Sequence, residues 1–246
     1  MIANDVRLRP LTARVAQRLR RLSLARGQDV FLGSEKELMA TFGVSRPTFR
    51  QAVNLVAHEQ LVEVVRGTRG GIYSRRPDIG GVIGPATAYL MTRRTTLRDM
   101  LEITGSLIDA ASLQAISCND PEMCERAQSL VNQMLCPSRA QTLEQFQDEE
   151  FQTISLLGEM AGNPATELLL KTLYAVGIAA FPSIFRDKSE LMQRRRIGRA
   201  RMMEAVLKKD MVSLSHINTS NRIVSEAKID EALLSQEMVM LWDADI

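Results

Sequence analysis

The sequence contains few aromatic residues, very few histidines and no long apolar run. Aromatic residues account for 4% of the 246 residues while methionine occurs 13 times, so we expect a mostly aliphatic and adaptable core. His58 and His216 are the only histidines, which leaves almost no material for a Ser-His-Asp triad or a His-rich metal site. No apolar stretch reaches the roughly 18 residues of a membrane span and the N-terminus shows no signal-peptide core, so we expect a cytoplasmic protein.

Cysteine is scarce as well. The chain has 3 cysteines, Cys118, Cys124 and Cys136, which is an odd number without a CxxC pair. This pattern is typical of ordinary reduced thiols rather than of a disulfide framework or a zinc site.

The formal net charge of +2 conceals an uneven distribution along the chain. Residues 1–76 hold 13 Arg and 1 Lys against 6 acidic residues, a net of +8. The remainder holds 17 basic and 23 acidic residues, a net of −6. An arginine-rich third joined to an acidic remainder favours nucleic acid as the partner of the N-terminal part, although a solvated basic face would give the same count.

The N-terminal third predicts a helix followed by a second, capped helix. Apolar residues recur at helical spacing across residues 11–25. Ser34 and Glu37 form a Ser-x-x-Glu capping box, in which the hydroxyl accepts from an N–H of the first turn and the glutamate reaches back. The helix that they start, 35–42, is expected to end at Gly43.

A third helix and a hairpin complete this part of the chain. Ser45 is a candidate N-cap, and Pro47 is tolerated in the first turn that follows it. Val62 and Val64 then alternate as in a strand, and the glycine-rich RGTRGG stretch predicts a turn before a return strand. Helix, helix, short turn, helix and basic hairpin, in that order, indicate a winged helix-turn-helix.

The start of the third helix is the expected DNA-reading element. In a helix-turn-helix the first residues of the second helix of the pair enter the major groove, where Arg46 could donate two hydrogen bonds to guanine. Lys36 is placed for a positioning phosphate contact, and the glycines of the hairpin tip permit close approach to the sugar-phosphate backbone. The residues expected to contact DNA are Lys36, Ser45, Arg46, Thr48, Arg50, Arg66, Gly67 and Arg69.

The rest of the chain is expected to be helical. Proline and glycine cluster before residue 86 and periodicity lapses there, which predicts a linker over residues 77–85. Beyond it apolar residues recur at helical spacing and no convincing strand follows Tyr73. The predicted fold class is mainly α, with a winged helix-turn-helix at 1–76 and an all-α bundle at 86–246 for effector binding and dimerisation.

Residues 32–74, LGSEKELMATFGVSRPTFRQAVNLVAHEQLVEVVRGTRGGIYS, resemble the winged-helix domain of the GntR family of bacterial transcription regulators. The positions that match are Leu32, Ser34, Glu35, Leu38, Val44, Ser45, Arg46, Arg50, Ala52, Leu61, Val62 and the glycine-rich wing. Two positions depart from the family, with Gly33 in place of proline and Gln60 in place of glycine. Gln60 would then stand at a helix end that favours a left-handed residue, at a modest cost.

The helical remainder resembles the FCD ligand-binding domain of the FadR-type branch of that family. The segments DEEFQTISLLGEMAGNP and EAVLKKD carry this likeness. Many FCD domains bind a divalent metal through one Asp and three His, and the corresponding positions here are Asp148, Gln152, Arg199 and Asn221. Only the carboxylate is retained, and arginine offers donors only, so the resemblance implies no metal at this site.

An organic effector is expected in place of the metal-bound one. Thr104 stands where many relatives carry an effector-binding arginine, and Arg199 could pair with Asp148 or bind an acidic head group. The ligand would be hydrophobic or acylated and would lie in a central cavity. The cavity would be lined by some of Leu101, Leu107, Phe151, Leu156, Met160, Leu169, Leu173, Phe181, Met202 and Met203. The run 194–196 of three arginines indicates a solvated face, or alternatively a contact with the phosphates of a CoA-like ligand.

Taken together, these features predict a ligand-responsive repressor of transcription, not an enzyme, that binds double-stranded DNA as a homodimer. A twofold dimer matches a short palindromic operator. One alternative is a non-specific architectural DNA-binding protein, which would show steep salt dependence without site preference. The other is an acyl-group hydrolase, for which the chain offers no GxSxG motif and no histidine paired with a nucleophile.

Overall fold

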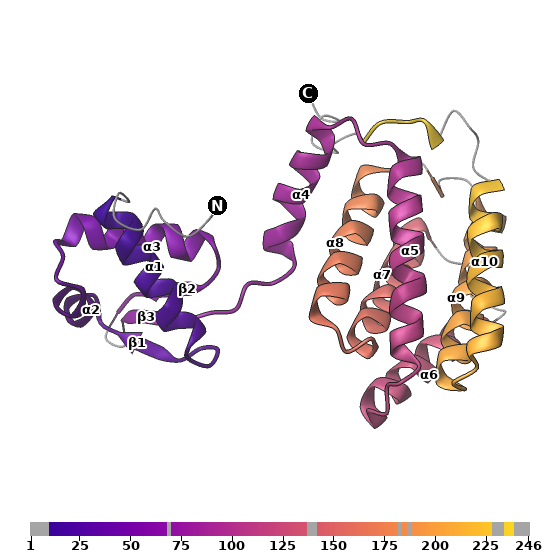
Figure 1. Ribbon diagram of the computed structural model, residues 1–246, viewed down its shortest axis with the longest axis horizontal. Helices are drawn as coiled ribbons and strands as arrows, with labels where there is room; N and C mark the ends of the chain where they lie inside the picture. The colour runs from indigo at the N-terminus through magenta and orange to yellow at the C-terminus, as the bar shows by residue number, and fades with distance from the viewer. Residues whose placement is uncertain are drawn as a thin grey trace. The chain divides into compact units, whose positions relative to one another are not determined.

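The computed structural model describes residues 10–67, 70–136, 142–181, 184–185, 188–227 and 234–238 of the chain. The chain divides into two compact units, of which the first ends at Gly81 and the second begins at Val82 (Figure 1). We call them the N-terminal unit and the helical unit.

The N-terminal unit combines helices with a small antiparallel sheet. In chain order its elements are α1 (Leu11–Leu24), β1 (Phe31–Gly33), α2 (Glu35–Phe42), α3 (Arg46–His58), β2 (Val62–Val65) and β3 (Gly71–Ser74). Strand β3 is central, with β1 and β2 on its two sides. The β2–β3 hairpin pairs Val62 with Ser74 at its base and Val65 with Gly71 near its tip. This arrangement confirms the expected winged helix-turn-helix.

Local caps fix the turn between α2 and α3. Ser34 Oγ accepts a hydrogen bond of 3.2 Å from the N–H of Glu37, whose carboxylate accepts one of 2.8 Å from the N–H of Ser34. Gly43 ends α2 in the left-handed conformation with φ 66°. Gln60, after α3, has φ 57°, as the family resemblance predicted. The capping box and the glycine stop could be predicted from the sequence because each depends on neighbours a few residues away.

Apolar packing between the three helices and the sheet holds this unit together. The side chains of Leu19 in α1 and of Phe49 and Val56 in α3 are fully buried, and Val62 and Ile72 of the hairpin pack against them. The hairpin is therefore attached to the helices through its base, which leaves its tip outside the core.

The helical unit contains α4 (Gly80–Thr92), α5 (Leu97–Ala115), α6 (Pro121–Leu135), α7 (Leu143–Met160), α8 (Pro164–Ala180), α9 (Ser189–Leu207) and α10 (Met211–Ala227). Apart from an isolated bridge between Thr96 and Glu237, its described residues form no β structure. Helix α5 packs against α7, α8 and α10, and α6 packs against α9 (Figure 1). This bundle confirms the predicted all-α remainder.

The core of the bundle is aliphatic and rich in methionine, as the composition predicted. Ile154 and Leu157 of α7, Met202 and Met203 of α9 and Leu214 of α10 are all fully buried in one cluster. Within the described part of the chain, no helix is both long and apolar enough to span a membrane.

Helix α4 corrects the expected linker of residues 77–85. The helix begins at Gly80, so most of that stretch is helical rather than irregular. Asp78 stabilises its start, because its Oδ1 accepts a hydrogen bond of 3.1 Å from the N–H of Gly81. Pro85 lies inside the helix, where its missing N–H removes one intrahelical hydrogen bond.

Tertiary packing explains why this helix forms against its own propensity. Glycine and proline are poor helix formers, which is why the sequence predicts a linker. In the structure, apolar residues of α4 pack against a second core cluster formed by other parts of the helical unit; these residues are Ile83, Ala86, Leu90 and Met91. The free energy that favours the helix therefore comes from burial of its apolar residues.

Candidate DNA-binding surface and effector pocket

The first turn of α3 presents polar and cationic side chains to solvent. Ser45 occupies the N-cap position, as predicted, but its side chain caps no backbone N–H. Its Oγ instead lies 3.1 Å from Oγ1 of Thr48. Arg46 and Arg50 are exposed by 63% and 61% of their side chains, so both guanidinium groups are accessible to a large partner.

Glu35 of α2 holds both arginines on one side of the turn. Its Oε1 lies 2.9 Å from the Nε atoms of Arg46 and Arg50, and it accepts a hydrogen bond from each. The hydrogen bonds from Arg46 and then Arg50 lower the pKa of the Glu35 carboxyl below its ordinary value. The carboxylate therefore pre-positions two cations that would otherwise be free to move.

A groove lies between α3 and the β2–β3 hairpin. Its lining includes Glu35 and Arg50 on the helix side and Arg66 and Gly67 near the hairpin tip. Gly71 lets β1 pack against the hairpin, because a Cβ there would lie 2.3 Å from the ring of Phe31 in β1. The groove thus brings one recognition-helix arginine and one wing arginine to the same concave surface.

The remaining expected DNA contacts lie outside the groove. Lys36 is exposed in the first turn of α2, whereas Ser45, Arg46 and the half-buried Thr48 lie at the start of α3. Arg69 lies outside the described residues. The assignment of these side chains to DNA contacts stays a prediction.

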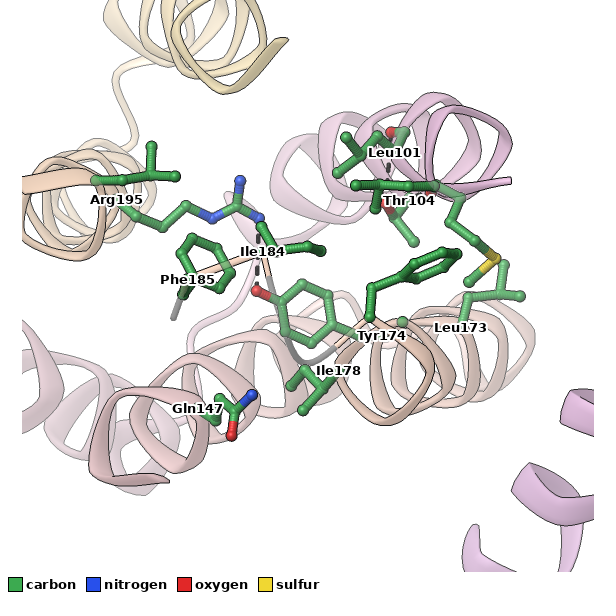
Figure 2. Close-up of a pocket in the computed structure, with 14 residues that line it drawn as sticks. Leu101, Thr104, Gln147, Leu173, Tyr174, Ile178, Ile184, Phe185 and Arg195 are labelled. Atoms are coloured by element: carbon green, nitrogen blue, oxygen red, sulfur yellow. Dashed lines mark hydrogen bonds between the residues drawn. The ribbon is translucent and has the colours of Figure 1, made fainter. Parts of the chain in front are cut away.

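The helical unit contains an apolar pocket. Figure 2 shows Arg195 reaching from α9 towards Tyr174 of α8, with Leu101 and Thr104 of α5 nearby. The residues that line this pocket are Leu97, Met100, Leu101, Thr104, Gln147, Leu173, Tyr174, Gly177, Ile178, Phe181, Ile184, Phe185, Leu191 and Arg195. The walls are mostly aliphatic and aromatic, and the few polar groups among them could orient a ligand.

A second, polar pocket shares Leu101, Thr104 and Arg195 with the apolar one. Its other lining residues are Gly105, Ile108, Asp109, Arg199, Asn218, Asn221 and Arg222. The Arg222 guanidinium donates to the Asp109 carboxylate across the gap between α10 and α5. Two pockets of opposite character therefore lie against the same three side chains.

A buried ionic cluster supports the boundary between the two pockets. Glu150 of α7 accepts hydrogen bonds from the Tyr174 hydroxyl and, at 3.0 Å, from Nε of Arg195. Its other oxygen lies 3.3 Å from Nε of Arg199. Burial by itself would raise the pKa of the Glu150 carboxyl, but the charges of Arg199 and Arg195 and the Tyr174 hydrogen bond lower it below its ordinary value. Glu150 is therefore an anion that fixes both guanidiniums.

The structure brings only some of the expected effector residues together. Thr104, Arg199 and Asn221 line the polar pocket, and Thr104 Oγ1 donates a hydrogen bond of 2.6 Å to the Met100 carbonyl. Asp148 and Gln152 are exposed and line neither of the two pockets. The suggested pairing of Arg199 with Asp148 is wrong, because Glu150 occupies that place.

These residues do not fit the divalent metal that many FCD domains bind. Arg199 brings a permanent positive charge with donors only, and the amide of Asn221 donates through Nδ2 to the Gly198 carbonyl at 3.1 Å. Asp148, the one carboxylate retained at the corresponding positions, is exposed to solvent. A cation is therefore already present where the metal would be, in the form of a guanidinium.

Several expected wall residues also lie elsewhere. Leu101, Leu173 and Phe181 line the apolar pocket as predicted. Leu156, Met160, Met202 and Met203 belong to the bundle core, Leu107 and Phe151 pack against that core, and Leu169 is 50% exposed. Helical periodicity identifies apolar faces, but it does not distinguish a filled core from a cavity.

The arginine run 194–196 is not a solvated face as a whole. Arg194 is exposed and pairs with Glu190 one turn earlier. Arg196 is buried and pairs with Glu149 at 2.6 Å, while Arg195 is directed to Glu150. Two of the three side chains are thus used in ion pairs within the bundle, which makes a phosphate-binding role for the run poorly supported.

Three residues of the polar centre were missed by sequence reasoning, namely Glu150, Tyr174 and Asn218. The consecutive acidic residues of 148–150 could have raised the question of which carboxylate meets the arginines of 194–199. Only the fold decides it, because α7 and α9 are far apart in sequence.

Two arginines at the start of a recognition helix, a basic hairpin beside it and a helical bundle that follows define a winged-helix DNA-binding regulator. Residues 11–72 match the bacterial regulatory proteins of the gntR family. The N-terminal unit therefore carries a DNA-binding domain of the gntR family.

Known relatives agree with this assignment. The chain is 28% identical over 205 residues to the HTH-type transcriptional repressor NanR of Cronobacter sakazakii, which covers 79% of this chain and 74% of that protein. Streptococcus agalactiae GntR has a similar fold, with a TM-score of 0.63 at 20% identity over 88% of this chain and 99% of that chain. The protein is a transcription regulator of the GntR family, and its place in the FadR-type branch stays a prediction.

Proposed function

We propose that this regulator is a repressor that binds a short palindromic operator as a homodimer and responds to a small hydrophobic or acylated effector. DNA binding is assigned to residues 1–76 and effector binding to residues 86–246. The observation that carries the first part is the pair of exposed arginines, Arg46 and Arg50, ordered by Glu35 at the start of α3. The similarity to a protein named as a repressor supports the direction of regulation.

Base reading is assigned to Arg46 and phosphate contacts to residues around it. A guanidinium at a recognition-helix N-terminus can donate two hydrogen bonds to one guanine, which discriminates by about 1–3 kcal/mol against another base. Lys36 and Arg66 would contact phosphates, which adds affinity without sequence preference.

Effector response is assigned to the apolar and polar pockets of the helical unit. A ligand shifts DNA binding only if it binds the DNA-competent and DNA-free conformations with different affinity. For a repressor released by its effector, the ligand must favour the DNA-free conformation.

Selection of bound duplexes from random DNA tests this proposal. The purified protein should enrich an inverted repeat with half-sites about one helical turn apart. Native mass spectrometry of the complex should show two protein chains per duplex. Enrichment of no sequence, with binding that falls steeply as salt rises, would instead identify a non-specific DNA-binding protein.

A further inference from the structure

Arg199 is a deeply buried cation with poor hydrogen-bond partners. Only 4% of the residue is exposed, yet its Nε has no hydrogen bond, although the oxygen of Glu150 lies 3.3 Å away. The partner of its Nη1 is the sulfur of Met202 at 4.0 Å, and thioether sulfur is a weak acceptor. A guanidinium keeps its charge in proteins, so burial in this state calls for a stronger acceptor.

The nearest carboxylate is shared. Glu150 accepts hydrogen bonds from Tyr174 and Arg195, so its negative charge is shared and compensates that of Arg199 only in part. The polar pocket has two other cations, and each has a partner: Arg195 pairs with Glu150 at 3.0 Å and Arg222 pairs with Asp109. Among the described residues of this site, Arg199 is thus the cation best placed to accept a further negative charge.

Asn218, in the same pocket, has a buried hydrogen-bond acceptor without a donor. Its Nδ2 donates a hydrogen bond of 2.9 Å to Ser112 Oγ, while its buried Oδ1 has no hydrogen-bond partner. The Ser112 hydroxyl donates to the Asp109 carbonyl at 3.0 Å, so its oxygen must accept from the amide. This fixes the amide orientation and leaves Oδ1 as an acceptor that seeks a donor.

The apolar pocket lies next to these two groups. Leu101, Thr104 and Arg195 line both pockets, so a molecule bound at Arg199 can extend past them. Beyond them the walls are apolar side chains such as Leu173 and Phe181. A ligand that satisfies both pockets is therefore polar at one end and apolar at the other.

We infer that the effector is a singly charged carboxylate with a hydroxyl or amide N–H close to the carboxylate and an apolar tail. Arg199 donates to the carboxylate, Asn218 Oδ1 accepts from the hydroxyl or N–H, and the tail fills the apolar pocket. This inference rests on the proposed function and names the chemical class of its effector. A phosphate monoester fits less well, because it carries up to about two charges at neutral pH.

Calorimetric titration of the full-length protein with matched probes tests the inference. The probes are butanoate, octanoate and dodecanoate, their 3-hydroxy acids, N-acylglycines of the same three lengths and the neutral amide of each hydroxy acid. At one tail length, the hydroxy acid or the N-acylglycine should bind at least about tenfold tighter than both the plain acid and the neutral amide. Absence of binding by all acids, or equal binding of acid and amide, overturns the inference.

Variants assign the two interactions separately. Arg199→Gln should abolish the preference for acid over amide, and Asn218→Leu should abolish only the preference for the hydroxyl or N–H. Glu150→Gln removes the competing anion and should strengthen acid binding several-fold, a gain that a misfolded protein cannot show. Arg194→Gln, exposed on the same helix, is the matched control and should change nothing. An acid preference that survives Arg199→Gln and does not rise in Glu150→Gln contradicts the assignment.

A mobility-shift assay with the selected duplex separates this inference from the proposed function. If the acids bind but DNA affinity is unchanged, the carboxylate site stands and the proposed effector response fails. If DNA binding is site-specific but no acid binds, the inference fails and the DNA-binding function stands.

Discussion

Glu35, in the first turn of α2, accepts a hydrogen bond of 2.9 Å from Arg46, in the first turn of α3. The same oxygen lies 2.9 Å from Arg50. A single carboxylate thus joins the two helices of the helix-turn-helix at the surface assigned to DNA, where it restrains the arginines and partly offsets their charge.

Replacing Glu35 with Gln should increase non-specific DNA affinity several-fold and steepen its salt dependence. The change removes a negative charge from the binding face and releases two arginines to phosphates. Because both ion pairs are exposed, the free energy of unfolding should change by less than about 1 kcal/mol. Fluorescence anisotropy with a random duplex at several salt concentrations measures this. Glu59→Gln, which removes the partner of Arg20, is the control. Weaker binding by the Glu35 variant would contradict the proposed role.

Arg46→Ala and Lys36→Ala should affect DNA binding in different ways. Loss of the Arg46 guanidinium should remove the preference for the selected operator over random DNA, at a cost of about 1–3 kcal/mol. Loss of the Lys36 charge should weaken both duplexes alike and reduce the salt slope by about one. Competition binding with the two duplexes distinguishes these results. Specificity that is unchanged in Arg46→Ala would refute the assignment of the recognition helix.

Gln60 combines a strained backbone with a useful side chain. Its φ is 57°, and its Oε1 accepts a hydrogen bond of 3.1 Å from the N–H of Asp78. Gln60→Ala should lose the hydrogen bond and keep the strain, whereas Gln60→Gly should lose both. The glycine variant should therefore be more stable than the alanine variant by about 1 kcal/mol. Hydrogen exchange of the Leu61 amide, which bonds to the Val56 carbonyl, reports the local difference. Equal exchange rates would show that the position carries no strain.

Tyr174→Phe should reduce the stability that the helical unit loses on acidification. The pKa of Glu150 is lowered in the folded protein, so its contribution to stability is present at neutral pH and is lost as pH falls through that lowered pKa. Without the Tyr174 hydroxyl the folded-state pKa rises towards the unfolded value, so the variant has less stability to lose and the loss ends at a higher pH. The variant should also lose about 1–3 kcal/mol at pH 7 because a buried carboxylate lacks a donor. Melting temperatures recorded from neutral pH to below the ordinary glutamate pKa of 4.5 check both effects. Parallel curves for the two proteins would exclude this role.

Local signals in the sequence were sufficient for the N-terminal unit. The capping box at Ser34 and the glycine stop at Gly43 each depend on a few neighbouring residues, and both are present in the structure. The left-handed Gln60, which the family resemblance implied, is present as well. The long-range features of the helical unit were not accessible in this way. Helical spacing places Asp148 and Gln152 on one face of α7, but only packing decides that this face meets solvent. Glu150 is buried because a distant helix supplies its cationic partners.

Helix α4 has little reason to be helical apart from what surrounds it. Ile83, Leu90 and their neighbours pack against a cluster that contains Leu97, Met100 and Phe181, and those same three side chains line the apolar pocket. The walls of the apolar pocket are therefore also the surface on which the first helix after the DNA-binding domain packs. A molecule that displaced those walls would act directly on the helix that follows the DNA-binding domain, without any relay through the rest of the bundle.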